Sequence, residues 1–175
     1  MLFFVKRVLP ILFIFSTSIV KAQEEKKGIQ WMSFSQAVAK SEANPKKIFI
    51  DVYTKWCGWC KRMDSSTYSD SAVITYMNQN FYAVKLDAET QDTIHFGDKD
   101  FVYRTEYKAN EIALALLNNQ MSYPTSVYLD EKFAMLGPSP GYQTTQQLLP
   151  QLKYFAENIY KIKTWEDYRK EVFGQ

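Results

Sequence analysis

Two cysteines lie three positions apart directly after an apolar run, in the segment FIDVYTKWCGWCKRM at 49–63. The run 48–50 predicts a buried strand, and the residues from about Gly58 onward are expected to form a helix. Side chains at positions i and i+3 of a helix share one face, which brings Cys57 and Cys60 near enough for a disulfide. A strand–loop–helix unit with both cysteines at the helix start is therefore the strongest constraint on the fold.

The position of the first cysteine has a chemical consequence. A helix start exposes unpaired backbone amides and the positive end of the helix dipole, which favour an anionic sulfur. Such sites lower a thiol pKa from about 8.5 to between about 3.5 and 7.5, and only the thiolate attacks a disulfide. We expect Cys57 to be an exposed nucleophile and Cys60 the more buried resolving thiol. This redox-active disulfide would need no other cofactor and no metal.

Three other interpretations of the cysteine pair remain open. A structural disulfide is one, although a bridge over two residues closes almost no loop and so constrains the unfolded chain little. A zinc half-site is the second, but it needs two more ligands and His95 is the only imidazole in the chain. An inert buried pair is the third, and the flanking tryptophans Trp56 and Trp59 argue against it.

Alternating strand and helix patterns follow along the chain. Asn44-Pro45 ends the first helix, and Pro150 is expected to kink or shorten the first turns of the helix that contains it. The predicted order is a helix-covered mixed sheet in an α/β fold. The expected strands are 47–53, 81–87, 122–130 and 132–137, with a hairpin around Gly97-Asp98; the expected helices are about 34–43, 58 onward with a continuation capped by Ser69 or Asp70, 110–118, 144–161 and 165–173.

Residues 1–22 form a separate segment. They carry Lys6 and Arg7 near the start, continue with an apolar run and end in small residues, the layout of a cleaved secretory signal peptide. A membrane anchor is the alternative, but it needs about 20 apolar residues and this run is shorter. The chain has 21 Lys and Arg against 19 Asp and Glu. Because the first 22 residues hold three of these bases and no acid, residues 23–175 carry a formal charge of −1. We expect a single exported domain, periplasmic or secreted and soluble, with no nucleic-acid partner.

The segment IFIDVYTKWCGWCK resembles the strand and active-site segment of the thioredoxin superfamily. AVKLD at 83–87 is similar to the next core strand, and SYPTSVYLD to the segment whose proline is cis. The resemblance covers about 31–160 and is nearest to exported thiol:disulfide oxidoreductases, including the C-terminal domain of the membrane thiol:disulfide interchange reductase. It implies a thioredoxin-like mixed β-sheet flanked by helices, with a hairpin-like insertion at about 89–106 before the cis-proline segment and a C-terminal helical extension at about 164–173.

The resemblance also implies roles for four residues outside the cysteine pair. Asp51, desolvated on its strand so that its pKa rises, would take the proton of the resolving thiol, and Lys85 would be its charge partner. The Tyr123-Pro124 bond would be cis. Pro124 would then present backbone to an incoming peptide, and Tyr123 would line the docking surface. The alternatives are an ordinary strand acid, a surface lysine and a core tyrosine.

The residues around the cysteines depart from the family pattern. Gly58 and Trp59 replace the Gly-Pro of thioredoxin. Trp56 and Trp59 would form an apolar rim at the docking surface, with Trp56 expected to pack and Trp59 to be exposed. The pair Lys46-Lys47 is expected to be solvated.

These features predict an enzyme, a protein disulfide oxidoreductase, acting on protein or peptide thiols and disulfides. No charged residue lies between the cysteines to stabilise the thiolate further, which favours the reductase direction and implies an electron donor, a membrane relay protein. Two alternatives remain: a thioredoxin-like binding or chaperone module without turnover, and metal delivery through the two thiolates.

Overall fold

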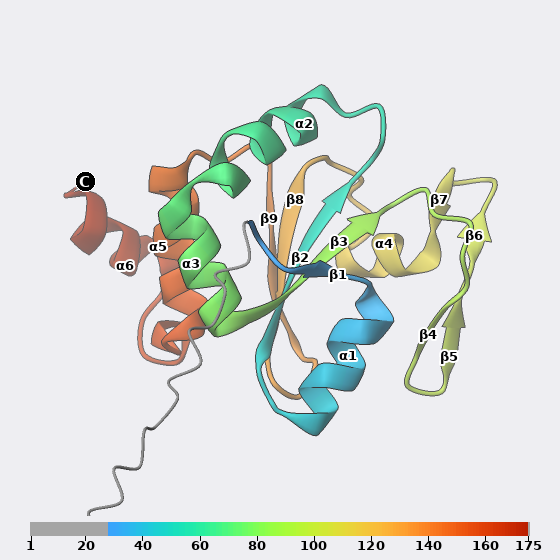
Figure 1. The fold of residues 1–175 in the computed structure, drawn as a ribbon, viewed down its shortest axis with the longest axis horizontal. Coiled ribbons are helices and arrows are strands. Elements are labelled where there is room, and N and C mark those ends of the chain that lie inside the picture. Colours follow the sequence, from blue (N-terminus) through green and yellow to red (C-terminus); the bar gives the residue numbers. More distant parts are fainter. Residues whose placement is uncertain (1–27, 175) are drawn as a thin grey trace, which may run out of the picture.

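The computed structural model describes residues 28–174. The predicted signal peptide therefore lies outside the described residues. The core of the fold is one mixed sheet of five strands in the order β1–β3–β2–β8–β9 (Figure 1). Strands β1, β3 and β2 are parallel, and β8 and β9 are antiparallel to their neighbours. The strand bounds are Trp31–Met32 (β1), Lys47–Tyr53 (β2), Phe81–Asp87 (β3), Thr125–Leu129 (β8) and Met135–Pro140 (β9).

Helices cover both faces of this sheet (Figure 1). Ser33 begins α1 with a capping box, in which its hydroxyl accepts from the Gln36 amide while the Gln36 side chain accepts from the Ser33 amide. Asp70 caps α3 through the amides of Ala72 and Val73. The helix bounds are Phe34–Ala43 (α1), Gly58–Ser65 (α2), Ser71–Asn80 (α3), Glu111–Leu116 (α4), Thr145–Ala156 (α5) and Trp165–Phe173 (α6), with 3₁₀ turns at Thr67–Ser69 and Ile159–Lys161.

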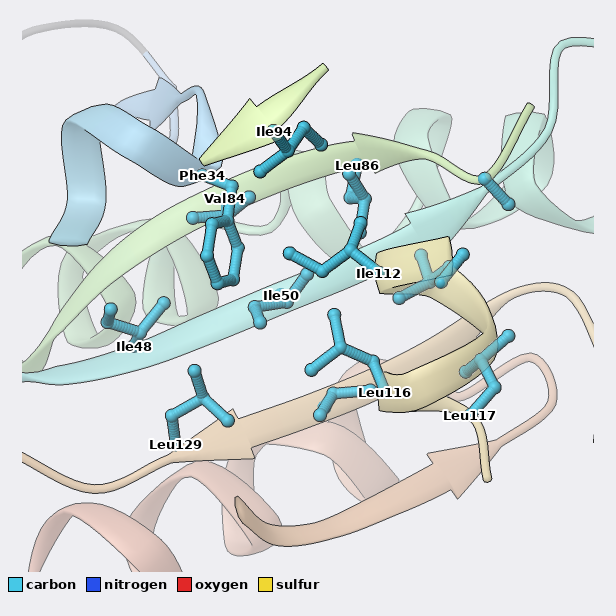
Figure 2. Packing of buried hydrophobic residues seen from close by; sticks show 14 of the residues in the cluster. Phe34, Ile48, Ile50, Val84, Leu86, Ile94, Ile112, Leu116, Leu117 and Leu129 are labelled. Carbon is cyan, nitrogen blue, oxygen red and sulfur yellow. The ribbon is translucent and has the colours of Figure 1, made fainter. Parts of the chain in front are cut away.

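Strand β2 divides the core into two clusters because successive side chains point to opposite faces. Ile48 and Ile50 belong to the cluster under α1 and α4, and Figure 2 shows Ile50 there together with Ile112 of α4. Phe49 belongs to the other cluster, which α2, α3 and α5 cover. Asp51 lies two residues after Phe49 on β2, so the two side chains point to the same face of the sheet. Its side chain is therefore directed to the face that carries α2, the helix of the cysteines.

The insertion before the cis-proline segment is a hairpin, as predicted. Strands β4 (Ile94–Phe96) and β5 (Lys99–Phe101) pair antiparallel, and Gly97 supplies the positive φ of +58° in the turn. A second short pair, β6 (Tyr103–Arg104) with β7 (Ala109–Asn110), follows and was not predicted. The hairpin packs on the body through Phe96, whose ring lies 5.3 Å from that of Phe34 and 5.6 Å from that of Phe133.

Several predicted boundaries were wrong: β8 begins at Thr125 rather than at 122, and α5 ends at Ala156 rather than at 161. The last strand begins at Met135 rather than Lys132, because Asp130 forms a loop in which its carboxylate accepts from the amides of Lys132 and Ala134. Pro150 does not shorten α5, which begins at Thr145 and runs past the proline to Ala156. The Tyr123–Pro124 bond is cis, as the resemblance implied.

Candidate redox site

Cys57 and Cys60 form a disulfide at the N-terminus of α2. Cys57 is the N-cap residue, and its Sγ accepts a hydrogen bond from the Cys60 amide at 3.1 Å. The Cα atoms of the two cysteines are 5.3 Å apart. The first sulfur therefore lies where a helix start offers an amide donor and partial positive charge, the environment that stabilises a thiolate.

The exposure of the two sulfurs differs from the expectation in one respect. Cys57 is 5% exposed and Cys60 is 2% exposed. The order is as predicted, but the expectation of an exposed first sulfur is wrong for the disulfide form. Cys57 nevertheless lies between exposed residues in the chain, since Trp56 is 66% exposed and Gly58 is also largely exposed. Cys57 therefore lies just below the protein surface, and little of the residue is accessible to solvent.

Asp51 is buried beneath α2. It is 1% exposed, and its Oδ2 lies 2.5 Å from the Lys85 Nζ in an ion pair. The Tyr68 side chain also lies close enough to lower the pKa of this carboxyl slightly. Burial raises the pKa of Asp51, and the opposing attraction of Lys85 only partly offsets it. Asp51 is thus a desolvated carboxylate suited to accept a proton.

Lys85 lies between two carboxylates. Its Nζ pairs with Asp51 and also with Asp64 of α2. Aromatic rings surround it, with centroids 5.2, 5.0 and 5.2 Å from Nζ for Trp31, Tyr53 and Tyr68. Burial by itself lowers the pKa of Lys85, but the two carboxylates outweigh it and the pKa is raised. Lys85 therefore stays cationic.

Asp64 connects this pair to the cysteines and was missed by the sequence interpretation. It lies four residues after Cys60 on α2, so the two side chains share one face of the helix. Because Asp64 contacts Lys85 and Lys85 contacts Asp51, that face of α2 lies over Asp51. The i, i+4 spacing from Cys60 was the signal in the sequence that could have identified it.

Further buried polar groups near Asp51 are unsatisfied. The Thr54 and Tyr68 hydroxyls have no hydrogen-bond partner among the described residues. Burial raises the pKa of Tyr68 well above its ordinary value, and the charge of Asp51 adds to this, so Tyr68 stays protonated. Buried polar atoms are normally paired. The polar groups around Asp51 do not offset its burial, which remains the largest effect on its pKa.

The rim of the site is aromatic. Trp56 was expected to pack, but it is exposed; its Nε1 donates to Glu89 Oε1 at 2.9 Å, and its ring lies edge-on to Tyr123 at 5.9 Å. Glu89 is the first residue of the predicted insertion, so the insertion reaches the site. Trp59 is 61% exposed, as expected, and its ring is 5.4 Å from that of Tyr142.

The cis-proline segment lies beside this rim. Tyr123 is half-buried, and burial raises its pKa to about 12. The Pro124 carbonyl accepts from the Gly141 amide at 2.8 Å, which ties this segment to the loop before α5. Within residues 28–174 no group of three His, Cys, Asp or Glu side chains is placed to hold a metal ion, and His95 pairs instead with Asp100 on the hairpin surface.

The fold and the CxxC disulfide together define a thioredoxin-like domain with a redox-type cysteine pair. The chain belongs to the family described as "Thioredox_DsbH: Protein of unknown function, DUF255", whose profile matches residues 13–175. The resemblance to the thioredoxin superfamily that the sequence motifs indicated is thus confirmed.

Relatives with curated names match only over short segments. An uncharacterized protein of Caenorhabditis elegans is 33% identical over 67 residues, which is 38% of this chain and 9% of that protein. The thiol:disulfide interchange protein DsbD of Campylobacter jejuni is 36% identical over 55 residues, which is 31% of this chain and 10% of that protein. The matched segments therefore span about a tenth of the length of these relatives.

Solved structures share the fold over most of the chain. A thioredoxin-fold protein from Helicobacter pylori matches with a TM-score of 0.59 and 22% identity, covering 75% of this chain and 82% of that one. A structure titled "DsbH Oxidoreductase" matches with a TM-score of 0.52 and 18% identity, covering 83% and 96%. At these identities the likeness establishes the α/β thioredoxin-like fold.

Proposed function

We propose that this protein is a thiol:disulfide oxidoreductase that acts on protein disulfides. In the reductase direction, the Cys57 thiolate attacks one sulfur of a substrate disulfide, forms a mixed disulfide and releases the other substrate sulfur as a thiolate, which takes up a proton. Cys60 then loses its proton and attacks Cys57 Sγ, which releases the second substrate thiolate. The substrate gains two electrons and two protons, and the Cys57–Cys60 disulfide forms.

One observation supports this proposal above the others. The Cys57–Cys60 disulfide lies at the first turn of α2, with Cys57 as the N-cap and the Cys60 amide donating to its sulfur. A structural bridge could join any two segments, but this one lies where the helix start makes the first sulfur the better nucleophile and leaving group. The family and structural likenesses to DsbH and DsbD agree with this chemistry.

Asp51 and Lys85 are proposed to serve the second step. Cys60 is the more buried sulfur, so it needs a nearby base to become a thiolate. Asp51 is buried on the same face with a raised pKa, and Lys85 limits that rise by holding one positive charge at Oδ2. In this role Asp51 accepts the Cys60 proton, and Lys85 and Asp64 position it.

The redox direction and the cellular location of the protein are inferred from the sequence. Gly58-Trp59 places no charge between the cysteines, which favours a reductant. We propose that residues 1–22 direct export, that the domain works in the periplasm or outside the cell, and that a membrane electron-donor protein re-reduces it. None of the helices within residues 28–174 has the length and hydrophobicity needed to cross a bilayer.

Trapping tests the proposed function. Cys60→Ser removes the resolving thiol, so mixed disulfides should accumulate between Cys57 and substrate proteins and should dissolve on adding dithiothreitol. Cys57→Ser is the matched control and should trap nothing. Insulin reduction with dithiothreitol should be accelerated by the wild-type protein and by neither variant. Absence of trapped adducts together with absence of insulin reduction would refute the proposal.

A binding module without turnover is the second candidate. The low exposure of Cys57 and the high exposure of Trp56 and Trp59 favour it, because these rings offer apolar contact area while the sulfur is nearly covered. This candidate predicts that unfolded polypeptides bind equally well to wild type and to Cys57→Ser, with no insulin reduction.

A further inference from the structure

A groove of about 460 Å³ runs between β9, α5 and α6. It is lined by the end of β9, by glutamines of α5, and by one face of α6 that includes Trp165 and Arg169. Its volume is in the range that holds a few side chains of a bound peptide. The α6 face comes from the C-terminal helical extension, which packs on α5 through the Trp165 ring at 5.3 Å from that of Tyr154.

The groove is continuous with the rim of the cysteine pair. Tyr142 lines it, and the Tyr142 ring also contacts the exposed Trp59 ring at 5.4 Å. Trp59 directly precedes Cys60 in the chain. The Trp59–Tyr142 contact thus joins the loop of the cysteines to one end of the groove.

The groove contains polar groups that are not used within the fold. Gln151 lines the groove, and its Oε1 accepts from the Tyr128 hydroxyl, which leaves the Nε2 amide as the group that can donate to an occupant. Arg169 is the one charged side chain among the lining residues, and no carboxylate within the described part of the chain pairs with it. The Gln151 amide and the Arg169 guanidinium are both donors at the groove, and together they favour a carboxylate as the occupant.

The neighbouring sheet edge is closed to strand addition. Strand β9 is the edge strand, and its outer part contains Pro138 and Pro140, which have no amide hydrogen to donate. A peptide at this edge must therefore be recognised through its side chains or its carboxylates. This agrees with the donors that the groove presents.

We propose that the groove between β9, α5 and α6 binds an acidic segment of the substrate polypeptide, with a Glu or Asp carboxylate on Arg169 and the Gln151 amide. This inference rests on the proposed function and deepens it, because it identifies the substrate class as proteins with acidic residues near the reactive disulfide. The groove would hold that segment while its cysteine reacts at Cys57.

Peptide disulfides test this proposal. Each peptide carries one cysteine as a mixed disulfide with a chromogenic thiol. In one series of peptides a single glutamate is placed at each position in turn. In the reference series a glutamine replaces that glutamate, which removes the charge. The reduced wild-type protein should cleave the best glutamate peptide about fivefold faster than its glutamine counterpart, the size of effect expected for one charge pair at a partly exposed site. Arg169→Gln should abolish this preference.

Lys170→Gln is the matched control, since it makes the same charge change at an exposed neighbour outside the groove. It should keep the preference. A small uncharged disulfide should react at the same rate with wild type and both variants. If none of the three proteins reduces it, the proposed function itself is wrong, and the groove has not caused the loss. The proposal would be overturned if wild type cleaved the glutamate and glutamine peptides at equal rates. It would also be overturned if Arg169→Gln and Lys170→Gln lost the glutamate preference to the same extent. Self-association that Arg169→Gln abolishes would likewise overturn it by assigning the groove to a second copy.

Discussion

Asp51 is a carboxylate whose charge state is determined by burial more than by its partner. Its pKa is raised although Lys85 lies 2.5 Å away, because the cost of burying the charge exceeds the attraction of Lys85. A raised pKa means that the folded protein binds this proton more tightly than the unfolded chain does. The stability contribution is therefore present below the unfolded pKa of about 4 and is lost as pH rises from there to the raised pKa of Asp51.

Removing this buried charge should stabilise the fold. Asp51→Asn should make the oxidised protein more stable at neutral pH by about 1–3 kcal/mol, because it removes the desolvation cost of an ionised carboxyl whose pKa burial raises. Lys85 keeps Asp64 as its partner in the variant, so the fold should be retained. Urea unfolding at a series of pH values measures the effect, and the difference from wild type should vanish below about pH 4.

Asp64→Asn is the control for this prediction. It also removes one carboxylate from Lys85, but Asp64 is partly exposed, and such pairs contribute about 1 kcal/mol or less. A loss of stability at neutral pH in Asp51→Asn would contradict the account of Asp51.

Some residues of the site were predictable and others were not. The alternation of β2 placed Asp51 on the face opposite Ile50, and the parallel register places it directly beside Lys85. Lys47 was expected to be solvated but is buried, because Glu131 and Asn158 from distant segments reach its Nζ at 2.6 and 3.1 Å. Pairings of this kind depend on tertiary packing and leave no local signal in the sequence.

At the scale of elements, the β4–β5 hairpin is an insertion that packs on the body through apolar side chains. Phe96 packs on Phe34 and Phe133, and Ile94 belongs to the same core cluster. The hairpin was predictable from the Gly97-Asp98 turn. Strand β1 and the pair β6–β7 were not, because two-residue strands are too short for a periodic pattern.

Truncating the aromatic contact of the hairpin should weaken the fold. Phe96→Ala should destabilise the protein by about 2 kcal/mol, because it removes a half-buried ring from an aromatic cluster. His95→Ala is the neighbouring control on the opposite face of β4; it is exposed and should change stability by less than about 0.5 kcal/mol. Denaturant unfolding measures both changes. A similar loss in the two variants would contradict the placement of the hairpin.

At the scale of the whole molecule, the central position of β2 joins the site to the core. Its neighbour β3 carries Lys85 and its other neighbour β8 directly follows the cis-proline, so the two pairings of one strand position both the charge partner and the docking segment. The sequence interpretation predicted the buried strands and the CxxC unit from strong local patterns, and the roles of Lys85 and Pro124 from the resemblance, but it did not predict the strand order. It missed the groove beside α6, since a groove is created only when β9, α5 and α6 come together.

The most direct test is the pKa of Cys57 itself. In the reduced Cys60→Ser variant only Cys57 can be alkylated, and the rate of reaction with iodoacetamide as a function of pH gives its ionisation. The position of Cys57 at the start of α2 predicts a midpoint between about 3.5 and 7.5, against about 8.5 for the same variant unfolded in denaturant. A midpoint in the folded protein at or above about 8.5 would contradict the account.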